Sequence, residues 1–330
     1  MSHPSLPLHR RAFLWSCFLL AILPTAIIGC RQSVLRVAII PRTTALTIWE
    51  AVHAGAEFAA GPAGIQIYWN APTSEDDIQQ QASLIDRVID EHYQGLIVAP
   101  DQPLALMAPV QRAVSRGVHT VVIASPLPIP PRENLAYFVN DDEATGRMAA
   151  LRVGSILKGK GRVAVLGINP ESLSDLTILH AFETDLEKQF PQIVISDRRT
   201  GTHNDVEAQQ IADEVLRAHP DLNAIFTLSA VASYGAIAAL QSRDLTGKIK
   251  LIGFEQSVEL GNQVRAQCMD SLIAEDTYQM GYRALTLLAE HRHGVLPAQE
   301  VKLTPTLLTR ENIDSPQAKR LINQDWGHGS

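Results

Sequence analysis

Short apolar runs rich in β-branched residues alternate with longer amphipathic runs along most of this chain, and the alternation occurs twice. The first short run covers residues 34–40, and the first long run, over 48–60, has its apolar residues at helical spacing. Strands separated by helices of this length favour right-handed crossovers, which build a parallel sheet with helices on both faces. The alternation therefore predicts an α/β fold of doubly wound parallel sheets.

The two halves of the alternation have the same order and similar spacing. In the first half, strands are expected over 34–40, 65–69, 95–99, 119–123 and 136–139, with helices over 48–60, 76–91 and 104–115. In the second half, helices are expected over 144–157, 176–189, 205–218 and 233–241, with strands over 162–166, 193–198, 224–228 and 250–254. Two similar lobes are therefore expected rather than one large sheet.

Length and charge limit the classes of function. The chain has 330 residues, which is enough for two domains. It carries 28 Lys and Arg against 35 Asp and Glu, and it has no run rich in Lys or Arg. Phosphate binding needs a clustered basic face, so nucleic acid is not expected as a partner. No spacing of cysteine and histidine fits a zinc site, and the sequence predicts neither a metal nor a cofactor.

The first 30 residues are typical of an export signal. Arg10 and Arg11 precede an apolar stretch over 12–28 that is short for a membrane span. The stretch ends in Ile27-Ile28-Gly29-Cys30, which resembles the bacterial lipobox, and this resemblance implies that Cys30 is diacylated on sulfur and becomes the mature N-terminus. An uncleaved membrane anchor is the alternative. The residues around Arg10 and Arg11 also resemble the twin-arginine pattern, so the export route stays open.

The cysteines predict a fold without disulfides. Cys17 would leave with the signal and Cys30 would be lipidated, so only Cys268 would remain. One thiol makes no internal disulfide, and the fold must therefore be held together by its core.

Short segments spread along most of the chain are similar to those of one protein family. They occur in order between about residues 34 and 294 and include Ala54-Gly55-Ala56-Glu57, Gly95–Pro100, Gly117–Val122, Asn140-Asp141-Asp142, Ala218–Phe226 and Ile252–Glu255. Together they resemble the ribose-type (type 1) periplasmic sugar- or solute-binding proteins of bacterial ABC transporters. The same fold occurs in the ligand-sensing half of lactose-repressor-type regulators.

The resemblance implies that the chain crosses three times between the lobes and so forms a three-strand hinge. The crossings are expected near 140–141, 275–276 and 303–305. The expected domains are a signal peptide with lipobox over 1–30, an N-terminal lobe over 34–140 plus 276–303, a C-terminal lobe over 141–275 plus 304–315, and a tail over 316–330. Ligand would bind between the lobes, at the carboxyl ends of strands, and would favour the closed form.

The resemblance also implies a ligand site with polar and aromatic side chains. Sugar hydroxyls need hydrogen-bond partners, and apolar ring faces are covered by aromatic side chains. Glu255 is the strongest candidate, because a carboxylate at a strand end needs a partner. The expected ligand-binding residues are Arg42, Trp49, Asn140, His203, Ser229, Glu255 and Glu275.

Four of these residues have structural alternatives. Trp49 is also compatible with packing in the core, and Arg42 with exposure to solvent. Asn140 is also compatible with a turn or a helix cap, and His203 with a surface loop.

The sequence departs from the family's sugar-binding pattern at three places. Ser125-Pro126 replaces an Asp-Arg pair, Asp175-Leu176-Thr177 replaces a region with an arginine, and Leu46 replaces a polar residue. The usual pentose-binding set is therefore absent. The remaining glutamates and arginine would also suit an amino sugar, a cyclitol or another small polar molecule.

Catalytic motifs are absent from the sequence, and an enzyme is not expected. There is no nucleophile elbow, no Gly-rich phosphate loop and no His-Glu-x-x-His motif. Glu255 and Glu275 could in principle form a glycosidase pair. Asp141 and Asp142 are interpreted as acids that cap a helix and complement its dipole, rather than as an acid–base pair.

The resemblance implies capture of a small polar ligand, a sugar or sugar-like polyol, for delivery to an ABC importer. The implied partners are this ligand, ABC permease subunits and the membrane, the last through lipid on Cys30. The protein is expected to be an exported, membrane-anchored, monomeric lipoprotein, periplasmic or on the cell surface. A sensory receptor for a membrane kinase or chemoreceptor is an alternative, and a glycoside-processing enzyme is a weaker one. A leader stands where a repressor has its DNA-binding helix-turn-helix, which disfavours a transcription repressor.

The lipobox predicts that the Cys30→Ala variant is exported without a lipid. Cell fractionation with immunoblotting should find this variant in the soluble fraction and the unmodified protein with the membrane. Cys17→Ala, which changes a residue of the leader, should leave the membrane attachment intact. A Cys30→Ala protein that stays in the membrane would instead support an uncleaved anchor.

Overall fold

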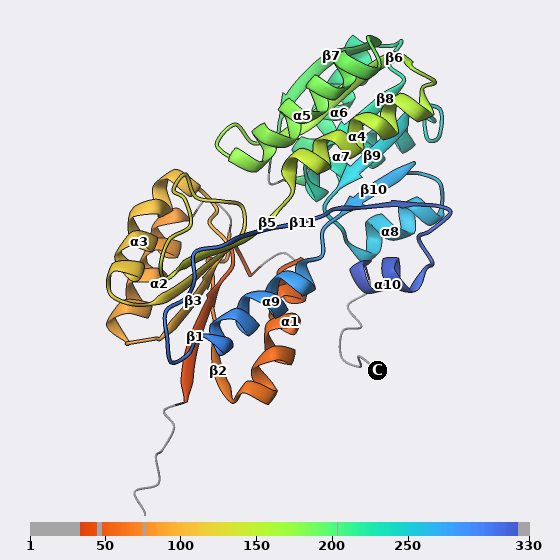
Figure 1. Cartoon of the computed structure of the whole chain (residues 1–330). Coiled ribbons are helices and arrows are strands. Elements are labelled where there is room, and N and C mark those ends of the chain that lie inside the picture. The colour runs from red at the N-terminus through yellow and green to blue at the C-terminus, as the bar shows by residue number, and fades with distance from the viewer. Residues whose placement is uncertain (1–33, 45–47, 75–76, 203, 323–330) are drawn as a thin grey trace, which may run out of the picture. The chain divides into compact units, whose positions relative to one another are not determined.

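The computed structural model describes residues 34–44, 48–74, 77–202 and 204–322 (Figure 1). The predictions for the leader, including Cys30, and for His203 lie outside the described residues. The described helices and strands form two lobes, each built on a six-stranded sheet. Within these ranges, no helix combines the length and the apolar character that crossing a membrane requires.

The first lobe is built on a sheet of order β11-β5-β4-β3-β1-β2, in which every neighbouring pair of strands is parallel. Its strands are β1 (Leu35–Ile40), β2 (Ile65–Trp69), β3 (Gly95–Val98), β4 (His119–Ala124), β5 (Leu135–Asn140) and β11 (Glu300–Leu303). Its helices are α1 (Ile48–Ala63), α2 (Ile78–Asp90), α3 (Pro103–Ser115) and α9 (Thr277–Glu290). Helices α1 and α9 pack on one face, and α2 and α3 on the other (Figure 1).

The second lobe has a sheet of order β12-β10-β9-β8-β6-β7, in which only the β10–β12 pair is antiparallel. Its strands are β6 (Lys160–Ile168), β7 (Gln192–Thr200), β8 (Ala224–Thr227), β9 (Lys250–Phe254), β10 (Ser271–Ala274) and β12 (Thr306–Thr309). Its helices are α4 (Asp142–Ile156), α5 (Leu173–Gln189), α6 (Asp205–Ala218), α7 (Ala230–Ser242), α8 (Val258–Arg265) and α10 (Pro316–Ile322).

Each sheet separates two apolar cores because successive side chains of a strand point to opposite faces. In β1, Val37 and Ile39 pack with α1 and α9, whereas Ala38 and Ile40 pack with α2 and α3. Strand β6 repeats this division between the α4–α5 face and the α6–α7 face. A strand buried on both faces reads as a continuous apolar run, which is why these strands were recognisable in the sequence.

The chain crosses between the two sheets three times. It leaves the first sheet after β5, returns to it after β10, and leaves it again between β11 and β12. These crossings confirm the predicted fold class of two doubly wound α/β lobes joined by a three-strand hinge. The residue bounds assigned to each lobe and to the tail stay a prediction.

The periodicity analysis ended at β9, so the elements after it were not predicted from periodicity, and the helix that corresponds to α9 was expected only from the family resemblance. Helix α8 has eight residues and β10 has four, and runs this short carry little periodic signal. The expected tail begins with α10, whose Ala318, Leu321 and Ile322 pack in the core of the second lobe. A short helix with three buried apolar residues is therefore part of that lobe.

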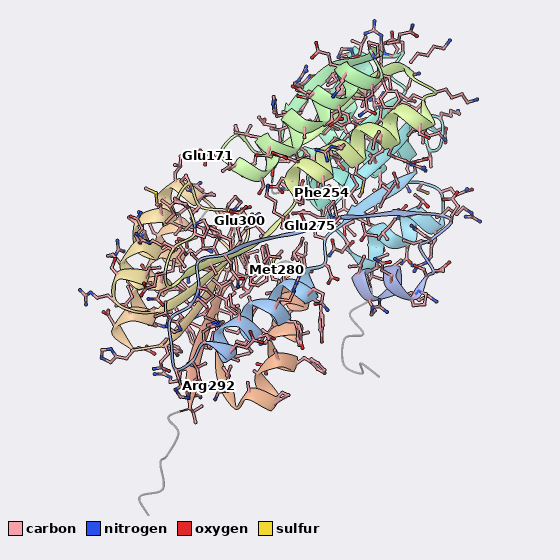
Figure 2. All side chains as sticks on the ribbon, in the orientation of Figure 1. Glu171, Phe254, Glu275, Met280, Arg292 and Glu300 are labelled. Carbon is pink, nitrogen blue, oxygen red and sulfur yellow. The ribbon has the colours of Figure 1, made fainter. Side chains whose placement is uncertain are left out.

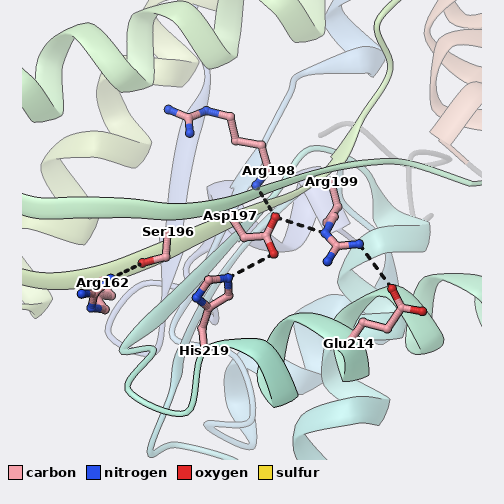
Figure 3. Close-up of polar contacts among 7 residues, drawn as sticks. All are labelled: Arg162, Ser196, Asp197, Arg198, Arg199, Glu214 and His219. Carbon is pink, nitrogen blue, oxygen red and sulfur yellow. Dashed lines mark hydrogen bonds and ion pairs between the residues drawn. The ribbon is translucent and has the colours of Figure 1, made fainter.

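Strand β7 lies at one edge of the second sheet and carries charged side chains (Figure 3). Asp197 accepts hydrogen bonds from Arg199 Nε at 3.1 Å and from the backbone nitrogen of Arg198 at 2.8 Å, and it lies 3.2 Å from His219 Nε2. Burial acts to raise the pKa of Asp197, but the hydrogen bond and charge of Arg199 hold that pKa below its ordinary value. Charges on an edge strand oppose pairing with a strand of another molecule.

Glycine allows paired helices to approach closely in both lobes. A Cβ on Gly55 of α1 would collide with the carbonyl oxygen of Tyr278 on α9. A Cβ on Gly281 of α9 would collide with the carbonyl oxygen of Val52 on α1. Gly146 of α4 has the same relation to α5 in the second lobe. These helix pairs therefore need a residue without a side chain at the crossing point.

We expect Gly281→Ala to destabilise the protein by roughly 1–3 kcal/mol, because the added methyl forces α1 and α9 apart. Urea unfolding followed by circular dichroism measures this loss. The matched control is Gly61→Ala on α1, where an added Cβ meets nothing within 4 Å. This control should be neutral or stabilising by up to about 1 kcal/mol. Equal stabilities for the two variants would contradict the close helix crossing.

Candidate functional site

The carboxyl ends of strands from both sheets meet at a pocket, which we call the central pocket. Residues just after β1, β4, β9 and β10 contribute to its wall, as expected for ligand sites of open α/β sheets. Figure 2 labels two residues of the wall, Phe254 and Glu275. The polar and aromatic residues of the wall are Arg42, Trp49, Ser125, Asn140, Asp142, Ser174, Asp175, Phe254, Glu255, Glu275 and Thr277.

The structure brings most of the sequence-predicted site residues together. Five of them line the central pocket, namely Arg42, Trp49, Asn140, Glu255 and Glu275. Ser229 lines an adjoining pocket of about 900 Å³, which shares Arg42, Asp175 and Glu255 with the central pocket. His203 lies outside the described residues. A role of these residues in ligand binding stays a prediction.

Arg42 is held in place by the first lobe. Its Nε donates to the carbonyl oxygen of Pro100 at 3.2 Å, and its Nη2 donates to Ser125 Oγ. Its guanidinium carbon lies 5.8 Å from the centre of the Trp49 ring. The guanidinium is therefore positioned beside the aromatic wall before any ligand arrives.

Two hydrogen bonds join the lobes near the pocket. Ser125 Oγ lies 2.8 Å from Ser174 Oγ, which belongs to α5 of the second lobe. Gln102 Nε2, just before α3, donates to Glu171 Oε2 at 2.7 Å; Glu171 is labelled in Figure 2. Ser125 stands where the family pattern has an acidic residue, so this replacement still provides a polar contact between the lobes.

Trp49 packs in the core and also lines the central pocket, and its role in ligand binding stays a prediction. Its side chain is 5% exposed and packs in the core of the first lobe. It also lines the central pocket, and its indole Nε1 is buried without a hydrogen-bond partner. A buried N–H donor is usually satisfied, so this one is available to a ligand acceptor.

Glu275 is the most buried acid of the pocket, with 7% exposure. Gln256 holds its backbone on both sides, because Gln256 Nε2 donates to the Glu275 carbonyl oxygen and Gln256 Oε1 accepts from the Glu275 nitrogen at 3.0 Å. Burial, together with the charges of Asp142 and Glu255, raises the pKa of Glu275 well above its ordinary value, while Arg42 and a hydrogen bond with Asn140 act against this rise. One carboxyl oxygen of Glu275 has no partner.

The expectation that Asp141 and Asp142 lie at a helix start and complement its dipole agrees with the structure, but Asp142 also lines the central pocket. Asp141 is the cap of α4, since its Oδ1 accepts from the backbone nitrogen of Ala144 at 3.1 Å. Asp142 is only 8% exposed and lines the central pocket. Burial raises its pKa to about 7, with Asp175 and Asp141 adding to the rise and Arg42 and a hydrogen bond from Ser174 opposing it. Two adjacent acids thus have different roles because only the first points back to the helix start.

Glu255 and Ser229 meet at the start of α7. Glu255 has a φ of 64°, and its Oε2 accepts from the backbone nitrogen of Ala230 at 2.9 Å. Ser229 Oγ accepts from the backbone nitrogen of Ala232 at 3.1 Å and so caps the helix. A left-handed backbone is uncommon for a residue other than glycine and is enriched at functional sites. The hydroxyl oxygen of Ser229 accepts the capping bond but keeps its own O–H to donate, so both residues stay candidate ligand contacts.

Asp175 was not predicted as a site residue. It lies in the first turn of α5, where it accepts from the Asn169 nitrogen at 2.9 Å and from Ser172 Oγ at 2.9 Å. Burial raises its pKa above the ordinary value. One sequence feature could have indicated this residue, since the segment Asp175-Leu176-Thr177 replaces a region that has an arginine in the family pattern. Asp175 adds an acid to the pocket wall.

Another pocket, in the second lobe, is less suited to a ligand. It includes Arg152 and Asp270, but these two residues pair with each other at 2.7 Å. Among the described residues, no group of three or more His, Cys, Asp or Glu is placed to hold a metal ion. The central pocket is therefore the candidate site that combines burial with polar atoms lacking partners.

Known proteins similar to this chain have the same architecture. The D-allose-binding periplasmic protein of Escherichia coli K12 is 24% identical over 285 residues, which cover 83% of this chain and 91% of that protein. The xylitol-binding protein of Mycolicibacterium smegmatis is 23% identical over 256 residues, covering 76% and 70% respectively. A carbohydrate transporter solute-binding protein of Agrobacterium radiobacter, solved with D-arabinose, superposes with a TM-score of 0.82 at 21% identity, covering 88% of this chain and 100% of that one.

The family assignment rests on a sequence model that spans most of the chain. A model described as a periplasmic binding protein domain matches residues 37–294. This range begins in β1 and ends just after α9, so it includes parts of both lobes and the central pocket. The chain therefore belongs to the periplasmic binding protein family.

Proposed function

We propose that this protein captures a small, sugar-like polar ligand in the central pocket and delivers it to an ABC importer. The observation that carries the proposal is the set of buried polar atoms without partners around the pocket, on Trp49, Asn140, Asp142 and Glu275. Leaving such atoms unsatisfied costs free energy, and a ligand rich in hydroxyl groups would satisfy them. Relatives named for binding allose and xylitol support the same ligand class.

The lobes would act by closing on the ligand. The wall combines Arg42 and Trp49 of the first lobe with Asp175 and Glu255 of the second. A ligand that contacts both lobes stabilises the closed form over the open one by the difference in its binding free energy between them. Members of this family are solute-binding components of transport systems and not enzymes, so closure presents the ligand without chemical change.

The site and the cellular location are parts of the same proposal. We assign ligand contacts to Arg42, Trp49, Asn140, Ser229, Glu255 and Glu275, with His203 as a further contact and Asp142 and Asp175 added from the pocket geometry. Periplasmic binding proteins act outside the cytoplasm. We propose that this protein is held at the membrane by lipid on Cys30, acts as a monomer, and contacts the permease subunits of an importer.

A thermal-shift screen tests the proposal. The panel contains D-allose, D-ribose, D-arabinose and xylitol, together with amino sugars and cyclitols. A ligand present at a hundred times its dissociation constant should raise the free energy of unfolding by about 2.7 kcal/mol, because it binds only the folded state. A panel in which no member raises the melting temperature would contradict a sugar-like ligand.

Glu255→Gln tests the pocket itself with the panel member that stabilises the protein most. We expect its affinity to fall by about tenfold to a hundredfold, the usual loss for a hydrogen bond to a charged group. Isothermal titration calorimetry measures this change. Glu259→Gln, at an exposed position on α8, is the matched control and should bind as the unmodified protein does. Unchanged affinity in Glu255→Gln would remove this residue from the site.

A further inference from the structure

The charges in the wall of the central pocket are unbalanced. Among the described lining residues there is one cationic side chain, Arg42, against four carboxyl groups, those of Asp142, Asp175, Glu255 and Glu275. Two of these acids are more than nine-tenths buried, at 8% exposure for Asp142 and 7% for Glu275. Carboxyl groups packed together away from water destabilise one another unless a cation or a proton compensates them.

The buried atoms without partners specify what the ligand must offer. Three of these atoms in the pocket wall are oxygen acceptors, Asn140 Oδ1, Asp142 Oδ1 and Glu275 Oε1, and one is a donor, Trp49 Nε1. The hydrogen bond between the Asn140 side chain and the carboxyl group of Glu275 leaves the amide oxygen of Asn140 as the atom that faces the ligand. A matching ligand needs several donors and at least one acceptor. An ammonium group supplies three donors, and a neighbouring hydroxyl supplies an acceptor.

We propose that the ligand is a hydroxylated amine, an amino sugar or amino polyol whose ammonium group lies between Asp142 and Glu275. This proposal rests on the proposed function and names the ligand class of the same site. The hydroxyl groups would contact Trp49 Nε1, Asn140 and Glu255. The ammonium would add a second positive charge to a wall in which Arg42 is the one cationic side chain among the described lining residues.

Arg42 does not balance the acids by itself. Its charge lowers the pKa values of Asp142, Asp175 and Glu275, yet all three pKa values remain above the ordinary ones because burial outweighs it, and neighbouring acids add to the rise for Asp142 and Glu275. Two of its nitrogens also donate to Pro100 and Ser125. A second positive charge inside the pocket would therefore favour the ionised form of the acids.

The first experiment compares matched pairs of probes that differ by an amine. The pairs are D-glucosamine with D-glucose, D-galactosamine with D-galactose, and 1-amino-1-deoxy-D-sorbitol with D-sorbitol. Isothermal titration calorimetry at pH 7.5 should show that the amine of at least one pair binds about tenfold tighter or more than its neutral partner, as a charge-assisted hydrogen bond predicts.

Two variants then locate the ammonium group. Asp142→Asn and Glu275→Gln should each reduce this preference for the amine by about tenfold, with a smaller effect on the neutral partner. Both variants should melt at the same temperature as the unliganded parent or above it, because a buried acid has been removed. The matched control is Asp86→Asn, which removes an acid from a surface ion pair with Arg112 on the first lobe. This control should keep the full preference.

The pH dependence of the unmodified protein gives an independent test. The pKa of Asp142 is raised to about 7, so its carboxyl group ionises as the pH rises from 6 to 8. The charged groups around it are Arg42, Asp141, Asp175 and Glu275. Affinity for 1-amino-1-deoxy-D-sorbitol, which keeps its proton over this range, should therefore increase between pH 6 and pH 8. Affinity for D-sorbitol should not increase.

The outcomes separate this inference from the proposed function. Tight binding of neutral sugars without a preference for any amine would overturn the inference and leave sugar capture intact. Binding of simple alkylamines as tight as that of their hydroxylated counterparts would overturn the need for hydroxyl groups. If no probe of either kind binds, both the inference and the proposed function are wrong.

Discussion

Burial of acidic side chains between two sheets is the constraint on which the rest of the site depends. Asp142 and Glu275 are held away from water at places where the chain crosses between the lobes, and their carboxyl groups lack partners for some of their oxygens. Burying carboxyl oxygens without partners costs free energy in the empty protein, and a complementary group that enters the site offsets this cost.

The sequence predicted the architecture well where the signal was periodic or continuous. The bounds of β2, β9 and α6 agree residue for residue with those expected, because two are compact apolar runs and the third is a strongly amphipathic helix with a clear cap at Asn204. Five short elements were missed because a run of four to eight residues seldom shows a period, namely α8, β10, β11, β12 and α10.

The site was predictable only in part, because strand ends can be located in a sequence but the direction of a side chain cannot. Residues that follow strands were expected in the cleft, and five of them line one pocket. Asp142 was expected only at the helix start, where it does lie, and its place in the pocket wall was not foreseen. In the sequence, Asp175 was noted only as part of a segment that replaces a region with an arginine in the family pattern. Its contribution becomes visible once α5 brings it beside Arg42 and Glu255.

The paired contacts between the Gln256 side-chain amide and the backbone of Glu275 affect how the molecule can bend. An amide that bonds to both the nitrogen and the carbonyl oxygen of one residue imitates a neighbouring strand, so Glu275 is fastened to the second lobe as firmly as β10 itself. Gln256 Nε2 also donates to Thr277 Oγ1 at 3.4 Å, so the same side chain reaches the first residue of α9. The acid of Glu275 would consequently travel with the second lobe as a fixed part of its surface during every cycle of opening.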